Sequence, residues 1–255
     1  MKHIFVLVLL ASVFACQPKK TETTEESTTD STEVTLTPVD TTANRLSAEQ
    51  KTAGWILLFD GQSKTGWRVF KNKENNSWEV VDGTLHCKPF DDNGTNLRAD
   101  LITENQYDNF ELAFDFKISK QGNSGVIFRA SEAHDEPYAT GPEYQVLDDG
   151  GYPGEVKETN FTAGAYDMYA AKNKKLNPPG EWNSGKIVAN GNHIEHWLNG
   201  EKVVEYEMNS PEWKKIRDAS KWKDFPAFAT VAKGHVDLQD HGNEVWYKNI
   251  MIKPL

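Results

Sequence analysis

Three stretches of the chain, at 124–130, 143–148 and 235–241, alternate apolar and polar residues with the two-residue period of a β-strand. We therefore predict three strands, each with one apolar face and one polar face. The apolar positions can pack into a core: Val126, Phe128, Tyr144, Val146, Val236 and Leu238. The polar positions fall on the opposite face: Arg129, Glu143, Gln145, His235, Asp237, Gln239 and His241.

This polar face has two interpretations. A half-exposed antiparallel strand normally alternates in this way, and its polar face is then solvated. Solvated strand faces usually carry Thr, Lys, Ser and Glu, whereas this face combines histidines, glutamines, an arginine and acidic residues. Because a polar ligand needs side chains of these types, we predict that the three strands form the floor of a binding site.

Other short runs predict further strands, at 55–59, 78–81, 84–87, 109–119, 184–189, 192–198, 201–206 and 244–253. Asn-Gly pairs at 190–191 and 199–200 separate three of these runs and indicate tight hairpins. One helix is predicted at 211–220, with Ser210 as its N-cap and Pro211 at its first position. Strands and helices do not alternate regularly, so we predict an all-β jelly-roll sandwich of two antiparallel sheets with one or two short helices.

The N-terminus reads as a targeting signal. Lys2 and His3 precede an apolar run at 4–14, and Ala15 and Cys16 follow it. This order is typical of a secretory signal, and a cysteine after the small residue resembles the bacterial lipoprotein box. An ordinary signal with a chance cysteine is the alternative. The run is shorter than the ~20 apolar residues that span a membrane.

We therefore predict a signal peptide at 1–15, lipidation of Cys16 and a location in the bacterial cell envelope, either periplasmic or on the cell surface. Residues 16–47 are rich in Thr, Glu and Ser and have nothing large to bury, so we predict a disordered tether. Residues 48–255 have the length of one domain. Contact with the membrane is expected through the lipid anchor only.

Charge and cysteine content exclude several classes of site. The net charge is −10 and no basic cluster is present, so nucleic acid is not a predicted partner. With Cys16 lipidated, Cys87 is the remaining cysteine, which excludes a disulfide and a multi-thiolate zinc site. A metal-binding alternative exists for four residues: His235, Asp237, Asp240 and His241. Their spacing is not a recognised ligand pattern, so we predict no metal and no cofactor.

Four short elements carry a family resemblance: FDG at 59–61, NSG-x-x-x-R at 123–129, E-x-Q-x-x-D at 143–148 and LQDHG at 238–242. In this order they resemble the 3-keto-disaccharide hydrolase family, and the resemblance extends over 54–255. It implies a concanavalin-like jelly roll and a glycan-processing enzyme that cleaves 3-keto-glycosides or 3-keto-disaccharides. The stretch at 149–162 resembles the family least.

Cleavage of a 3-keto sugar by elimination needs a base for the acidified C2 hydrogen, an acid for the leaving oxygen and a donor for the enolate oxygen. We predict Glu143 as the base and His241 as the acid. Arg129 is predicted to bind the ketone or enolate oxygen, and Gln145 a hydroxyl group. Two alternatives remain: Arg129 pairs structurally with Glu143, or His241 caps a turn before Gly242.

Further substrate-binding predictions are His235 and Gln239 on the same polar face, Tyr138 and Tyr166 as walls, and Trp182 as a sugar-stacking platform. A sugar oxidoreductase upstream, which would make the ketone, is an expected partner.

Two other function classes remain open. One is a non-catalytic carbohydrate-binding module, because jelly rolls commonly only bind. The other is a conventional glycosidase, which needs two facing carboxylates. Glu143 and Asp148 should face opposite sides of one strand, which weakens that second alternative.

Overall fold

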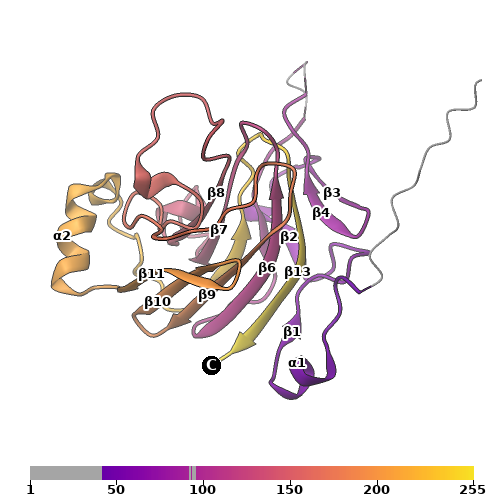
Figure 1. The fold of residues 1–255 in the computed structure, drawn as a ribbon, viewed down its shortest axis with the longest axis horizontal. Coiled ribbons are helices and arrows are strands. Elements are labelled where there is room, and N and C mark those ends of the chain that lie inside the picture. The colour runs from indigo at the N-terminus through magenta and orange to yellow at the C-terminus, as the bar shows by residue number, and fades with distance from the viewer. Residues whose placement is uncertain (1–41, 92, 94–95) are drawn as a thin grey trace, which may run out of the picture. The chain divides into compact units, whose positions relative to one another are not determined.

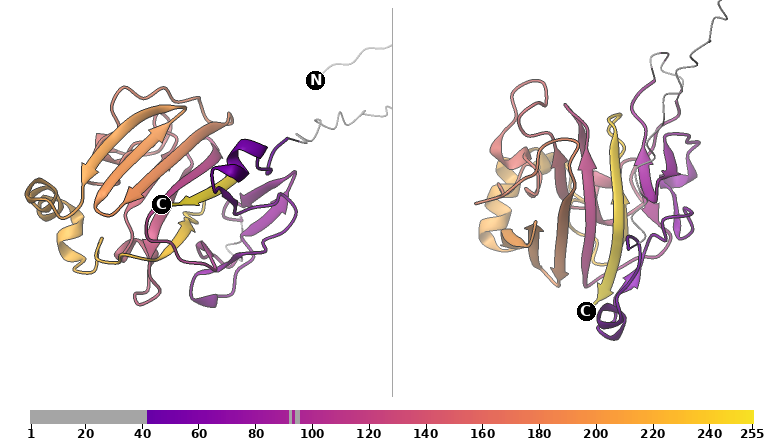
Figure 2. Two further views of the ribbon diagram at one scale, coloured as in Figure 1. Left: turned by 90° about the horizontal axis from the view of Figure 1, so that it is seen from below. Right: turned by 45° about the vertical axis from the view of Figure 1, so that its right-hand side comes forward.

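The computed structural model describes residues 42–91, 93 and 96–255. The predicted signal peptide, Cys16 and most of the predicted tether lie outside the described residues. Within them, two antiparallel sheets pack face to face, as Figures 1 and 2 show. This confirms the predicted all-β sandwich.

The larger sheet has eight strands and contains both Asn-Gly hairpins. At these turns Gly191, Asn199 and Gly200 have positive φ angles, which Asn and Gly adopt most readily. Seven strands lie in the order β11 (Glu201–Glu207), β10 (His193–Leu198), β9 (Asn183–Asn190), β6 (Phe110–Ile118), β13 (Val245–Pro254), β4 (Thr84–Cys87) and β3 (Trp78–Val81), and β1 (Ile56–Leu57) pairs with β13.

The smaller sheet has five strands, in the order β2 (Trp67–Val69), β5 (Leu101–Thr103), β12 (His235–Leu238), β7 (Asn123–Ala130) and β8 (Glu143–Leu147). The three stretches predicted to form a floor are therefore neighbours in one sheet. β2 and β5 are three-residue strands without a clear alternation, and the sequence pattern did not predict them.

The core lies between the two sheets. The rings of Phe114 on β6 and Tyr144 on β8 meet edge to face with centroids 5.3 Å apart, and Phe110 and Phe128 make a similar contact at 6.2 Å. The apolar faces predicted for β7, β8 and β12 all belong to this core. Loss of one such ring costs about 3–5 kcal/mol, so this packing fixes which face of the smaller sheet points outward.

Helices are short and lie at the edges of the sandwich. In α2 (Pro211–Ala219) the Ser210 hydroxyl accepts a hydrogen bond from the Trp213 N–H, which confirms the predicted cap. No described helix is long and apolar enough to cross a membrane. The other helical segments are α1 (Ala48–Thr52) and the 3-10 turns η1 (Phe70–Asn72), η2 (Pro137–Ala139), η3 (Glu158–Asn160) and η4 (Lys221–Asp224).

The end of the predicted tether is part of the folded domain. Asn44 is buried, its N–H donates to Oδ1 of Asn249 at 2.6 Å, and the Asn249 N–H donates to Oδ1 of Asn44 at 2.8 Å. The Asn44 amide also donates to the Gly83 carbonyl. Composition could not reveal this, because a single well-placed asparagine looks like any other polar residue of the run.

Candidate active site

The outward face of β7, β8 and β12 carries the predicted polar floor. Glu143 on β8 lies opposite Ile127 on β7, and Ile127 lies opposite Asp237 on β12. The Glu143 carboxyl group folds over Gly125, where a Cβ atom would lie 2.9 Å from the Glu143 Cδ atom. The glycine of the NSG element therefore makes room for the carboxylate of the E-x-Q element.

A pocket of about 220 Å³ opens above this floor. We call it the Glu143 pocket. The predicted residues Glu143, His241, Gln239, Tyr138 and Tyr166 all border it. Its complete lining is Asn123, Tyr138, Glu143, Tyr166, Lys221, Gln239 and His241.

A second pocket of about 350 Å³ adjoins the first, and we call it the loop pocket. Gln145, the remaining predicted polar residue of β8, lines this one instead. Four residues border both pockets: Asn123, Tyr166, Lys221 and His241. The rest of the lining is Gln145, Leu147, Tyr152, Glu155, Val156, Lys157, Asn160 and Asp167. The two pockets thus meet at a shared boundary that includes His241.

The floor holds several carboxyl groups in a poorly hydrated place. Burial, opposed by Lys221 and reinforced by Asp100, raises the pKa of Glu143 to about 8. Burial also raises the pKa of Asp100 to about 7 and that of Asp237 well above its usual range. Both carboxyl oxygens of Asp237 are buried without a hydrogen-bond partner among the described residues. Such an accumulation of perturbed acids is typical of a catalytic site.

His241 is held in place by its neighbour in the LQDHG element. Asp240 is paired with Arg98, accepts a hydrogen bond from the Ser77 hydroxyl at 2.6 Å and caps the Gly242 N–H at 3.1 Å. The turn is therefore capped by Asp240, not by His241. The side chain of His241 is exposed at the boundary between the two pockets. The protein atoms around its ring nevertheless exclude part of the water, and this desolvation lowers the pKa of its imidazole below the usual value.

Lys221 is a site residue that the sequence pattern missed. Its N–H donates to Oδ2 of Asp167, and the next residue, Trp222, donates from its indole to the Tyr166 carbonyl. These bonds set the Lys221 Nζ atom 4.1 Å from the centroid of the Tyr166 ring. Lys221 is largely exposed, but the atoms around it lower the pKa of its ammonium, an effect that Glu143 opposes. Lys221 is the first residue of η4, where strand alternation gives no signal.

Comparison with known proteins shows the family of the chain. Residues 54–253 match the family described as the 3-keto-alpha-glucoside-1,2-lyase-like domain. The chain belongs to this family. A 3-keto-disaccharide hydrolase of Bacteroides thetaiotaomicron is 35% identical to it in an alignment of 231 positions, and the match covers 79% of this chain and 79% of that one. Membership confirms the family predicted from the sequence motifs, and it confirms the enzyme class, a hydrolase.

Solved structures extend the likeness to three dimensions. A crystal structure from Parabacteroides distasonis, described as a candidate glycosyl hydrolase, has a TM-score of 0.77 and 37% identity, and the match covers 84% of this chain and 99% of that one. A second candidate glycosyl hydrolase of the same organism has a TM-score of 0.57 and 30% identity, over 74% of this chain and 99% of that one.

The family motif NSG-x-x-x-R ends at Arg129, which does not line either pocket. β7 carries a bulge opposite Val236, where the pairing with β12 shifts register and Arg129 takes a φ angle of 55°. The bulge breaks the alternation, so Arg129 leaves the face of Glu143. Its guanidinium donates instead to the carbonyl groups of Asp108 and Gly191 at 2.8 and 2.9 Å. The structure therefore supports neither of the two interpretations of Arg129, an enolate contact or an ion pair with Glu143.

His235 and Trp182 also lie outside the two pockets. His235 is buried, with Nδ1 2.6 Å from the Thr103 carbonyl oxygen and Nε2 2.9 Å from the Gln106 amide nitrogen. Trp182 lies against Lys117 and Lys248, whose strands belong to the larger sheet. Strand alternation placed His235 on the correct strand, but it could not reveal that Thr103 and Gln106 engage both ring nitrogens of His235. A turn-rich sequence likewise cannot show which sheet a tryptophan covers.

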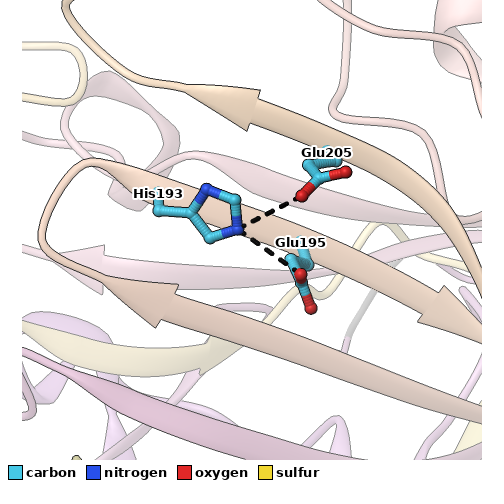
Figure 3. Close-up of side chains that lie close together, drawn as sticks. All are labelled: His193, Glu195 and Glu205. Carbon is cyan, nitrogen blue, oxygen red and sulfur yellow. Dashed lines mark hydrogen bonds and ion pairs between the residues drawn. The ribbon is translucent and has the colours of Figure 1, made fainter.

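The four residues of the metal-binding alternative do not gather their donor atoms. In the described part of the chain, one other group does so: His193, Glu195 and Glu205 on β10 and β11 (Figure 3). Lys202 already pairs with Glu195 at 3.2 Å and with Glu205 at 2.8 Å, and His193 contacts Glu207 at 2.6 Å. This group is a surface ion-pair network on the larger sheet, whereas the floor strands belong to the smaller sheet.

Proposed function

We propose that this protein cleaves 3-keto-glycosides by elimination of the leaving group and hydration of the resulting enone. The observation that carries the proposal is Glu143, a residue that is 4% exposed, borders a polar pocket and has a carboxyl pKa raised to about 8. Elimination followed by hydration also accounts for a family described as lyase-like that contains a named hydrolase.

In the first step Glu143 removes the proton at C2 of the sugar, next to the ketone at C3. The electron pair of the C–H bond forms an enolate, which expels the glycosidic oxygen at C1. His241 donates a proton to that departing oxygen. Water then adds to C1 of the enone while a proton returns to C2, so that the net change is hydrolysis.

Positions in the two pockets support these roles. Glu143 borders the Glu143 pocket alone, where the keto sugar would bind, whereas His241 lies at the boundary with the loop pocket. A glycosidic bond held across this boundary would place its oxygen beside His241. Lys221 is the cation available for the enolate oxygen in place of Arg129, because it borders the same pocket as Glu143.

The pKa shifts make Glu143 a stronger base and His241 a stronger acid, but they leave less of each group in its reactive protonation state at neutral pH. A carboxyl group with a pKa of about 8 is a better base than an ordinary glutamate, although only roughly a tenth of it is ionised at pH 7. A histidine with a lowered pKa is a better acid, although less of it is protonated. C–H bonds are weak acids, so a stronger base is an advantage in the step proposed for Glu143.

A conventional glycosidase is less well supported. Asp148, the other carboxylate of the E-x-Q-x-x-D element, accepts hydrogen bonds from the N–H groups of Gln121 and Gly151 at 2.8 and 3.0 Å. Both of its oxygens are therefore engaged with backbone, which suits a structural turn and not a nucleophile or acid.

The test is product analysis with a 3-keto-disaccharide beside its unoxidised parent, in heavy water. We expect cleavage of the keto substrate alone, with deuterium at C2 of the released 3-keto sugar. Cleavage of the parent as well would indicate a conventional glycosidase, and absence of any cleavage would indicate a binding module. Cleavage without deuterium at C2 at short times would exclude elimination followed by solvent protonation.

We further propose that Cys16 is lipidated and anchors the protein in the bacterial envelope, and that an oxidoreductase acting on the C3 hydroxyl supplies the substrate. The Cys16→Ser variant should move from the membrane fraction to the soluble fraction. Retention of that variant on the membrane would refute the anchor.

A further inference from the structure

We propose that the loop at 149–162 builds a subsite for the sugar that leaves, so that this loop sets the preference for disaccharides over simple glycosides. This inference rests on the function proposed above, and it concerns the half of the substrate on the far side of the scissile bond.

The loop supplies one wall of the loop pocket. Tyr152, Glu155, Val156, Lys157 and Asn160 all border it. Across the boundary lies the Glu143 pocket, with a volume of about 220 Å³ against about 350 Å³ for the loop pocket. With the keto ring beside Glu143 and the glycosidic oxygen beside His241, the next group of the substrate has to enter the loop pocket.

The base of the loop is fixed at both ends. Oδ1 of Asp149 accepts a hydrogen bond from the Thr162 N–H at 2.8 Å, and Oδ2 pairs with Lys174 at 2.5 Å. The Thr162 hydroxyl also accepts from the Leu147 N–H and donates to its carbonyl. These bonds tie the loop to the end of β8, the strand of Glu143, so the wall stands at a defined place relative to the catalytic carboxyl group.

The chemistry of the pocket fits a sugar. Oε1 of Gln145 is buried and has no hydrogen-bond partner among the described residues, while Nε2 of Gln145 donates to Asn123 at 3.3 Å. An unpaired buried acceptor is costly unless a ligand or water donates to it, and sugar hydroxyl groups are such donors. Tyr152, whose hydroxyl lies 3.4 Å from the Asn123 amide, adds an aromatic ring beside these polar groups.

A different groove would suit an aromatic leaving group. It lies on the other side of Tyr138 and is lined by Phe225, Pro226 and Ala227 together with exposed acidic residues. This groove shares Tyr138 with the Glu143 pocket but not His241. Because the proton donor stands at the boundary of the loop pocket, the structure favours the loop pocket for the leaving group.

The experiment compares a 3-keto-disaccharide with the methyl 3-keto-glucoside, which has no second ring. In the Tyr152→Ala/Glu155→Ala double variant, kcat/KM for the disaccharide should fall by about tenfold to a hundredfold, the worth of one or two hydrogen bonds. The kcat/KM of the double variant for the methyl glycoside should stay within about twofold of the wild-type value, because the methyl group ends at the boundary between the two pockets and does not reach the loop. Glu158→Ala is the matched control, an exposed glutamate of the same loop that borders neither pocket.

Product inhibition gives a second readout. The unoxidised sugar released from the disaccharide should inhibit the wild-type protein, and the double variant should lose that inhibition. Equal losses with both substrates would overturn the proposal, since the loop would then serve the keto sugar or the fold. No loss with either substrate would also overturn it and direct attention to the Phe225 groove. Failure of the proposed function itself is distinct: the wild-type protein would then cleave neither substrate.

Discussion

Glu143 is the residue on which the chemistry depends, and its environment explains why. It is buried on a strand whose other face packs into the core, and the protein leaves its carboxyl group little water. Lys221 stands close enough to lower its pKa, but burial outweighs that attraction and the net shift is upward, to about 8. Removal of a single nearby charge would therefore change the pKa of this carboxyl group less than a change in its burial would.

The first prediction removes the base and keeps its shape. Glu143→Gln should lower turnover of a 3-keto-disaccharide by ~10²–10⁴, the usual worth of a positioned acid or base. Binding of the substrate should change little, because the amide still fills the space above Gly125. The measurement is kcat beside the dissociation constant of the substrate. A variant with near wild-type turnover would assign the base to another group.

The second prediction separates base from acid by pH. In the wild-type protein the Glu143–His241 pair should give a bell-shaped dependence of kcat/KM on pH, with its upper limb near pH 8. The apparent pKa values of the two limbs describe the pair and cannot be assigned to one residue each. The His241→Asn variant removes His241 from this pair. Its substrate is an aryl 3-keto-glucoside, because an aryl leaving group needs no acid. If Glu143 is the base, activity of this variant should rise through about pH 8 to a plateau.

A profile without this rise would reverse the roles. If Glu143 were the acid, His241→Asn would have lost its base, so its activity would be low and, because the aryl leaving group needs no acid, would not rise through about pH 8. The uncatalysed breakdown of the keto sugar at each pH, measured without protein, is subtracted as the control.

At the scale of elements, strand parity predicted much of the site. Alternation placed Glu143, Gln145 and Gln239 on the outward face correctly, because β8 and the end of β12 are regular. It failed for Arg129, because the bulge in β7 turns that side chain away, and a bulge leaves no trace in an apolar–polar pattern. Lys221 could not be predicted, because the hydrogen bond that its backbone N–H donates to the distant Asp167 carboxylate positions it.

The third prediction concerns the glycine of the NSG element. Gly125→Ala should displace the Glu143 carboxyl group and lower kcat by about 10²-fold, the typical effect of a misplacement of about 1 Å. Gly150→Ala is the matched control, because a Cβ atom there meets nothing within 4 Å and its φ angle is not positive. Circular dichroism should show both variants folded. Similar activity of the two would mean that Glu143 can adjust without loss.

At the scale of the whole molecule, the sandwich was predictable and its loops were not. Two-residue alternation, Asn-Gly turns and a capped helix each have local causes, so they could be read from sequence. The loop at 149–162, the η4 turn and the ordered Asn44 depend on contacts between residues far apart in the chain. The site is thus built from a predictable floor and walls that only the folded chain defines.

The fourth prediction joins the site to the stability of the fold. An unfolded glutamate has a pKa near 4.5, whereas folded Glu143 has one of about 8, so the folded state holds a proton that the unfolded state releases. The stability that this proton contributes is complete below about pH 4.5 and is lost as the pH rises to about 8. Asp100 and Asp237, whose pKa values are also raised, act in the same direction.

Glu143→Gln should therefore melt close to the wild-type protein at pH 5 and above it at pH 8.5. We expect a gain of at least ~3 °C at the higher pH, since 1 kcal/mol moves Tm by about 2–4 °C in a domain of this size. Taking the difference between the two proteins at each pH cancels most of the contribution of Asp100 and Asp237. Glu158→Gln, an exposed glutamate, should show no such change with pH. A difference for Glu143→Gln that stays constant from pH 5 to pH 8.5 would mean that Glu143 carries no raised pKa, and the base would then lack the strength that removal of the C2 proton requires.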